Sequence, residues 1–284
     1  MASMRDIKRR RDSIQSTEQI TKAMKLVSTV KLQKSKNKAE ASKPYFNLMY
    51  QTISSILKKS GGLDHKYLRP GTSQKKAVIS ITSNRGLAGG YNNNIVKLIS
   101  GALPAGDTYV YAIGRKGRDG LARKGFEIRA DYSEVINEPL YRDAADLTLE
   151  LLDGFARGEI GEIYLAYTSF KNTVTHIPKL IKLLPVEMDV EEEDDKKAHA
   201  LMTYEPEEEE VLNSIVPKYM SSLIYGALLE AVASENGARM TAMDNATSNA
   251  EEMIEALSLQ YNRARQGAIT QELTEIVAGA NAIS

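Results

Sequence analysis

The stretch RMTAMDNATSNAEEMIEALSLQYNRARQGAITQEL, Arg239–Leu273, predicts a long helix. It contains no proline, is rich in Ala, Met, Leu, Glu and Gln, and belongs to a proline-free run from Lys218 to Ser284. At about 1.5 Å per residue, a helix over this run would extend about 100 Å, which is several times the diameter of a compact domain. The fold is therefore expected to contain a helix too long to be covered by a globular core alone.

The best apolar face of this run repeats every 3.5 residues on average, in ten steps over 35 residues. Its members are Leu229, Val232, Asn236, Met240, Met243, Ala246, Ala250, Met253, Leu257, Tyr261 and Ala264. A repeat of about 3.5 is typical of a left-handed coiled coil. One Asn and three Ala stand on this face, so the predicted contact is only weakly apolar.

The N-terminal segment predicts a second long helix, which pairs with the first. Its apolar residues follow helical spacing from Ile7 onward, and no proline occurs before Pro44, where a kink is expected because Lys43 is biased out of the helical region. A further apolar patch, Tyr45–Leu57, carries the helix on to Ser60-Gly61-Gly62. Because a compact middle segment connects the two helices, they are expected to be antiparallel. The predicted seam residues are Ile14, Ile20, Val27, Val232, Met243, Met253 and Leu257.

The middle segment predicts alternating strands and helices. The runs KKAVISITS, TYVYAIG and EIYLAYTSF indicate strands, and Asn94–Ile99 and Leu140–Phe155 have helical patterning. The predicted fold class is α/β: a long antiparallel coiled coil of the terminal helices plus a small Rossmann-like α/β domain with a parallel or mixed sheet. The expected domains are residues 1–60 (helix), 61–210 (α/β) and 211–284 (helix).

The charge is balanced over the chain, with 37 basic and 37 acidic residues, but it is segregated along it. Residues 1–43 carry twelve Lys or Arg against four Asp or Glu, a net charge of about +8. Residues 187–210 carry twelve acidic against two basic residues, about −10, and predict an exposed loop with a strand around Ala200–Tyr204. The chain has no cysteine, which excludes disulfides and a thiolate nucleophile. No run approaches 18 apolar residues, so we expect contact with a membrane only through partners.

No catalytic, cofactor or metal site is predicted. The glycine-rich stretches NRGLAGGYNNN and GRKGRDG lack the G-K-[ST] of a phosphate loop and are interpreted as structural turns, and the basic side chains of the second as exposed surface. The three histidines, His65, His176 and His199, are far apart in sequence. Nucleic-acid binding is disfavoured because the closing helix is net acidic and no aromatic residue precedes Tyr45. These patterns leave a static coiled-coil tether open.

Four motifs together resemble the gamma subunit of the F-type ATP synthase over the whole chain: QITKAMKLVSTVKL, SNRGLAGGYNNNI, ARMTAMDNATSNA and AITQELTEIVAGANA. The motif I-T-x-E-x-x-E-x-x-x-G-A-x-A, Ile269–Ala282, is the most specific. The resemblance implies a noncatalytic central rotor shaft that couples proton or sodium flow to ATP synthesis or hydrolysis. The implied partners are three alpha and three beta subunits, which hold the active sites in beta, and the epsilon subunit and c-subunit ring. The implied location is peripheral, on the cytoplasmic face of a bacterial cell membrane.

The resemblance also implies which residues meet partners. The positions that match the family's contacts with the moving loop of the beta subunits are Met24, Arg239, Arg265, Gln266, Thr270 and Glu272. The family's turn S-D-R-G-L-C-G differs here, because Asn84 and Ala88 replace the acid and the thiol. The cysteine-bearing insertion of the chloroplast form is absent, so thiol-redox regulation by that route is excluded.

Overall fold

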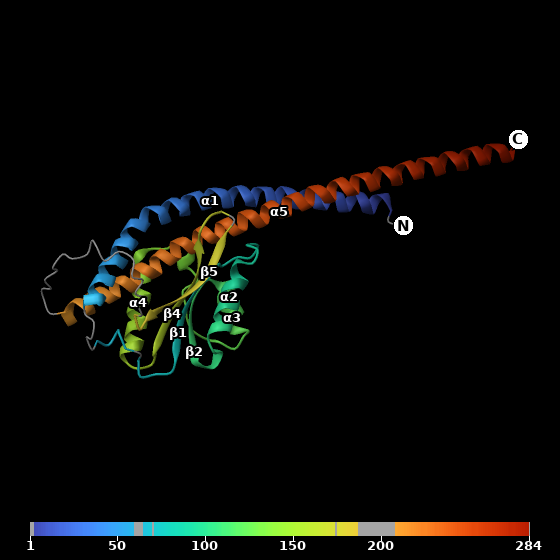
Figure 1. The fold of residues 1–284 in the computed structure, drawn as a ribbon. Helices are drawn as coiled ribbons and strands as arrows, with labels where there is room; N and C mark the ends of the chain where they lie inside the picture. The colour runs from blue at the N-terminus through green and yellow to red at the C-terminus, as the bar shows by residue number, and fades with distance from the viewer. Residues whose placement is uncertain (1–2, 60–64, 70, 174, 187–207, 284) are drawn as a thin grey trace. The chain divides into compact units, whose positions relative to one another are not determined.

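The computed structural model describes residues 3–59, 65–69, 71–173, 175–186 and 208–283. Two long helices, α1 (Met4–Lys59) and α5 (Glu208–Ile283), begin and end the described chain (Figure 1). By their contacts the residues form two units, one of residues 1–28 with 239–284 and one of residues 29–238. Each unit therefore contains a part of α1 and a part of α5.

The larger unit contains a five-stranded sheet in the order β3-β2-β1-β4-β5. The strands are β1 (Lys76–Ile81), β2 (Thr108–Ile113), β3 (Glu127–Asp131), β4 (Glu162–Phe170) and β5 (His176–Leu184). The pairs β1–β2, β1–β4 and β2–β3 are parallel, whereas β4–β5 is antiparallel. The predicted mixed sheet is thus confirmed, with three of its strands where the sequence placed them.

Helices cover both faces of this sheet, because the buried residues of the central strand alternate between two apolar clusters. Ile79 and Ile81 of β1 belong to the cluster that contains α4 (Tyr141–Ala156) and residues 212–231 of α5. Val78 belongs to the other cluster, with α2 (Tyr91–Ala102) and α3 (Arg115–Ala122). Two short 3₁₀ helices, Ala105–Asp107 and Val135–Asn137, complete the described elements. Full burial of one Ile or Leu stabilises such a core by about 1.5–3 kcal/mol.

The interpretation of GRKGRDG as a turn was wrong, because these residues begin and form most of α3. Gly114 has φ of 106°, a left-handed conformation that favours glycine. A Cβ at Gly117 would lie 2.6 Å from Thr82 Oγ1, and one at Gly120 would lie 2.9 Å from Val96 Cγ2. These glycines therefore let a helix pack closely on β1 and α2, a requirement that local sequence pattern does not reveal.

Both long helices include a proline. α1 passes through Pro44 to Lys59 and bends in this part, as expected (Figure 1). α5 begins at Glu208, close to the expected start at residue 211, and includes Pro217. One missing backbone donor is tolerated there because α5 buries Leu212, Val216 and Met220 in the core. The strand expected around Ala200–Tyr204 lies outside the described residues.

Candidate functional site

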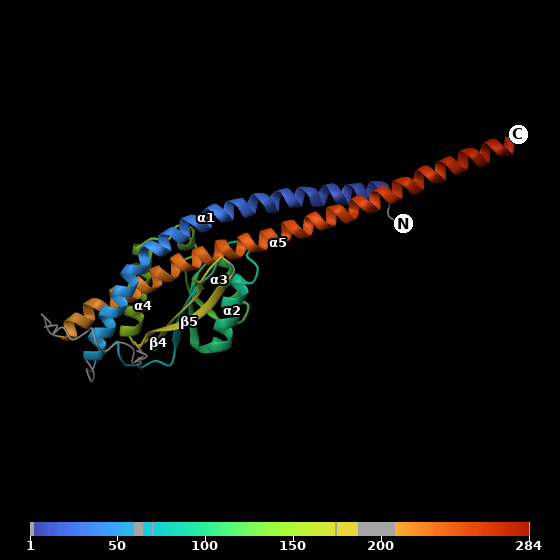
Figure 2. The ribbon, with the colours of Figure 1, turned by 45° about the horizontal axis from the view of Figure 1, so that its top comes forward.

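The smaller unit is a pair of helices that lie side by side (Figure 2). We call its buried and half-buried positions that recur every three or four residues the contact row. On α1 the contact row is Ile7, Arg11, Ile14, Glu18, Thr21, Lys25 and Ser28; on α5 it is Met240, Met243, Thr247, Ala250, Ile254, Leu257, Tyr261 and Ala264. Alternating steps of three and four give the mean repeat of 3.5 that the sequence predicted.

Side-chain contacts show that the pair is antiparallel. The Arg11 guanidinium lies 5.7 Å from the centre of the Tyr261 ring, while Thr21 Oγ1 and Thr247 Oγ1 are 2.8 Å apart and hydrogen-bonded. As the residue number rises on α1, that of its partner falls on α5. The Thr pair is buried, so a polar contact occupies a position that apolar residues usually fill in a coiled coil.

Two ion pairs between the helices and one within α1 lie near the Thr pair. Lys22 Nζ lies 3.2 Å from Glu251 Oε1 and 3.0 Å from Glu18 Oε1, and Lys25 pairs with Asp244. Hydrogen bonds to Glu18 and then Glu251 raise the pKa of Lys22. Each exposed ion pair contributes little to stability. Because these pairs join specific residues of the two helices, they nevertheless oppose a shift of one helix along the other.

The predicted seam needs correction at four positions. Ile20, Val27 and Met253 are 60%, 57% and 54% exposed, so they lie outside the contact row. Val232 belongs to the larger unit and packs against the core of the sheet. Of the other predicted residues, Met243 and Leu257 are buried and Ile14 is half-buried in the contact row. The predicted seam residues are all apolar, whereas the polar Glu18, Thr21 and Thr247 occupy three positions of the contact row.

The residues predicted to meet the beta subunits lie in three places within the smaller unit. Met24 is half-buried on α1, and Arg239 is half-buried on α5. The other four, Arg265, Gln266, Thr270 and Glu272, are exposed near the end of α5, far along the helix from Arg239. At 100° per residue, Arg265 and Glu272 share one face of the helix, and Gln266 and Thr270 share another.

The last part of α5 is exposed in the described part of the chain. Every residue from Arg265 to Asn281 is exposed, and in Figure 1 this segment continues past the N-terminal end of α1. Four of its large apolar side chains are 49–63% exposed: Ile269, Leu273, Ile276 and Val277. This end of the helix therefore offers both polar and apolar side chains for contact with other molecules.

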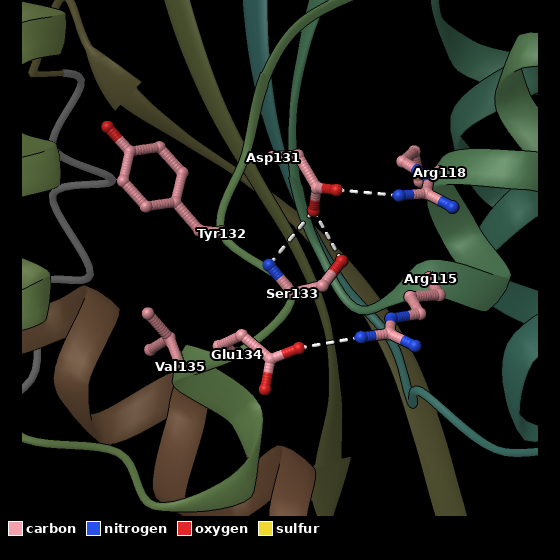
Figure 3. A pocket seen from close by; sticks show the side chains of 7 residues that line it. All are labelled: Arg115, Arg118, Asp131, Tyr132, Ser133, Glu134 and Val135. Atoms are coloured by element: carbon pink, nitrogen blue, oxygen red, sulfur yellow. Dashed lines mark hydrogen bonds and ion pairs between the residues drawn. The ribbon is translucent and has the colours of Figure 1, made fainter.

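A pocket of about 530 Å³ opens at the carboxyl edge of the sheet in the larger unit (Figure 3). Arg118 Nη1 lies 2.6 Å from Asp131 Oδ2, and Arg115 Nη2 lies 2.7 Å from Glu134 Oε1. Burial alone would raise the pKa of Asp131, but hydrogen bonds from Ser133 and Arg118 outweigh it and lower that pKa. Since each arginine is paired with a carboxylate, the pocket carries no uncompensated positive charge for an anion.

Asn84 connects the loops at this edge. Its Nδ2 donates to Ser133 O at 2.7 Å, and its Oδ1 accepts from Arg115 N, at the start of α3, at 3.0 Å. The sequence analysis noted Asn84 only as a departure from the family's acid. An amide can make both bonds, whereas a carboxylate can only accept.

Within the described ranges, no group of three or more His, Asp or Glu side chains is arranged to hold a metal ion. Among the helices that the structure describes, none is both long and apolar enough to cross a membrane.

The family model for ATP synthase matches residues 3–283, nearly the full chain. The chain belongs to the ATP synthase gamma family. Among its relatives, the ATP synthase gamma chain of Lachnoclostridium phytofermentans is 64% identical over 100% of both chains. The sodium ion specific gamma chain of Acetobacterium woodii is 42% identical over 99% of both.

Solved structures agree with this assignment. The Tetrahymena thermophila mitochondrial ATP synthase central stalk and c-ring structure contains a chain 25% identical, with a TM-score of 0.58, covering 80% of this chain and 99% of that one. A chain of the Euglena gracilis mitochondrial enzyme is 18% identical, with a TM-score of 0.59 over 92% and 95% of the two chains, and supports the fold. The predicted role as central rotor shaft is confirmed.

Proposed function

We propose that this gamma chain turns inside a ring of three alpha and three beta subunits and changes the conformation of each beta subunit in turn. The active sites lie in the beta subunits, and this chain is noncatalytic. The observation that carries the proposal is the antiparallel helix pair, whose contact row includes polar partners and whose residues Arg265–Asn281 are all exposed. Such a pair can touch surrounding subunits along its length.

The surface chemistry of the pair suits a part that must not stop at one angle. Burial of apolar area is worth about 25 cal/mol per Å², so 200 Å² of extra contact at one orientation would cost roughly 5 kcal/mol to break. The exposed positions between Asp244 and Glu255 are mostly small or polar, which keeps that difference small. The exposed apolar residues near Ile276 depart from this pattern. We assign them to the end of the shaft that the alpha and beta subunits enclose in the complex.

Six residues carry the proposed contacts with the moving loop of the beta subunits: Met24, Arg239, Arg265, Gln266, Thr270 and Glu272. The exposure of the last four supports the assignment. The larger unit contacts the epsilon subunit and the c-subunit ring, through which the chain is held on the cytoplasmic face of a bacterial membrane. Proton or sodium flow through the c ring would drive its rotation.

Co-expression tests the assembly. The chain is expressed with the alpha and beta subunits of a close bacterial relative, and the purified complex is analysed by native mass spectrometry and ATP hydrolysis. We expect one copy of the chain with three alpha and three beta subunits, hydrolysis by the complex, and none by the chain alone. A chain that purifies without this ring, or that binds the ring without affecting hydrolysis, would favour the static tether.

A further inference from the structure

Polar contacts attach α5 to the α/β part of the larger unit along the segment Glu230–Ser234. Tyr91 Oη of α2 donates to Ala231 O at 3.1 Å, and Ser234 Oγ donates to Thr168 O of β4 at 3.1 Å. Both donors are buried, with Tyr91 4% and Ser234 0% exposed. At the end of β4, Phe170 N donates to Glu230 Oε2 at 3.3 Å.

Close packing continues the attachment one turn further along the helix. A Cβ at Gly237 would lie 2.8 Å from His176 Cε1, so β5 approaches the α5 backbone where that residue has no side chain. Ala231 and Ala233, both 0% exposed, keep the same segment narrow. This segment is thus held by hydrogen bonds and by close packing at small residues rather than by large apolar side chains.

The geometry determines which motion the attachment opposes. At 100° per residue, Glu230, Ser234 and Gly237 lie within about 60° of one another on the helix, facing β4 and β5. Ala231 lies about 60° to one side of Ser234, where Tyr91 reaches it. The β4–β5 side and Tyr91 of α2 contact the helix from two different directions. Rotation of α5 about its own axis in either sense would therefore break hydrogen bonds.

We propose that Tyr91, Ser234 and Glu230 are torque-transmitting residues, which prevent α5 from turning relative to the sheet when the shaft works against a load. This inference rests on the proposed function, in which the c ring acts on the larger unit and the beta subunits act on the helix pair. The three residues position the helix and take no part in ATP chemistry.

The test uses the full enzyme, reconstituted in vesicles with the membrane sector of a close relative. The variant Tyr91→Phe/Ser234→Ala removes two hydroxyls and little volume. Ions pumped per ATP hydrolysed are measured without and with an opposing ion gradient. We expect unloaded hydrolysis and pumping to be unchanged and the pumping ratio under load to fall roughly twofold or more, as hydrogen bonds that oppose rotation are lost.

Two controls separate torque transmission from stability. Ser221→Ala removes a hydroxyl that is also buried in α5 but bonds only to Pro217 O of the same helix, and should leave the loaded ratio unchanged. Glu230→Leu should lower the loaded ratio, whereas Glu230→Gln, which keeps an acceptor for Phe170 N, should restore it. Equal loaded ratios for the double variant and the unmodified chain would overturn the proposal. If the unmodified chain supports no ATP-driven pumping, it is the proposed function that fails.

Discussion

Polar side chains occupy positions in the helix pair that apolar residues usually fill. The buried hydroxyls of Thr21 and Thr247 lie within hydrogen-bonding distance of each other, and each also lies near a carbonyl of its own helix, Glu18 O at 3.0 Å and Met243 O at 2.8 Å. Because each hydroxyl has one hydrogen, one hydroxyl donates to the other, which in turn donates to its own carbonyl. Every hydroxyl is therefore satisfied, which makes burial acceptable. A buried polar pair stabilises one register over its neighbours, because a shift would break the bond between the helices and leave each hydroxyl only the carbonyl of its own helix.

A double-mutant cycle measures this pair. Thr21→Val and Thr247→Val should each lower the free energy of unfolding by about 0.5–1.5 kcal/mol, and the double variant should lose less than the sum, with a coupling energy of at least about 0.5 kcal/mol. Denaturant unfolding followed by circular dichroism gives these values. Thr17→Val is the matched control, since its hydroxyl is exposed and bonds only to Ser13 O. Strict additivity would show that the hydroxyl contact does not stabilise the pair.

Asn84 offers a test of the loops at the carboxyl edge of the sheet. In Asn84→Asp the carboxylate would face Ser133 O without a hydrogen to donate, so we expect a loss of about 1–3 kcal/mol in the free energy of unfolding near neutral pH. The loss should shrink at acidic pH, because a protonated carboxyl can donate again. Asn93→Asp, at an exposed position of α2, is the comparison variant. A similar effect of both changes would count against the bridging role.

Among the strands, the three central ones were predictable and the two edge strands were not. β1 and β2 are almost continuously buried, and β4 alternates buried with half-buried residues, so their sequences read as largely apolar runs such as AVISI. β3 is short, charged and at the sheet edge, and β5 contains Pro178 and pairs antiparallel with β4. α3 contains two glycines in eight residues, a pattern that by itself favours a turn.

The contact row was predictable in its period but not in all its members. The mean repeat of 3.5 can be counted from the spacing of apolar residues in the sequence. Which residues belong to the contact row depends on which side chains face the partner helix. Met253 and Ile254 are adjacent and both apolar, and only contact with α1 determines that Met253 is 54% exposed and Ile254 half-buried. The paired charges of Lys22 and Glu251, far apart in sequence, give no local signal.

β5 begins with a titratable group, His176, whose environment predicts a pH dependence. Burial lowers the pKa of His176 below its ordinary value of 6.5, and its buried Nδ1 has no hydrogen-bond partner among the described residues. Below about pH 6.5, His176 binds a proton more readily in the unfolded chain than in the folded one. The free energy of unfolding should therefore fall as pH drops through about 6.5, and His176 should not affect it at higher pH. The slope between about pH 7.5 and 5.5 should be smaller in His176→Gln. Equal slopes for both proteins would exclude a contribution from His176.

Over the whole molecule, α5, like α1, belongs to both units, and it carries polar attachments in each. Residues 230–237 bond to the sheet and α2, and residues 244–261 bond to α1. A twist applied at one segment reaches the other through the backbone hydrogen bonds of a continuous helix. Arg239, at the boundary between the two units, is therefore a suitable place to ask whether this helix must rotate.

The chain has no cysteine, so one engineered thiol can form only one kind of bridge. Arg239→Cys is combined with a cysteine in the facing loop of one beta subunit, and other thiols of the complex are removed. A disulfide forms if the two Cα atoms approach within about 7 Å. Oxidation should stop ATP hydrolysis, because the covalent bridge holds the shaft at one angle, and reduction should restore it.

Position 239 is preferred to the end of α5 for a mechanical reason. A bridge in the last turn, near Ile283, would let a frayed helix end swivel about its own backbone bonds while the rest of the shaft turned. At residue 239 the helix continues for many hydrogen-bonded turns on both sides, so rotation past the bridge would require unwinding it. Hydrolysis and the yield of crosslinked product are measured on the same sample before and after reduction. A nearly fully crosslinked complex that hydrolyses ATP as fast as its reduced form would show that rotation of this helix is not required for turnover.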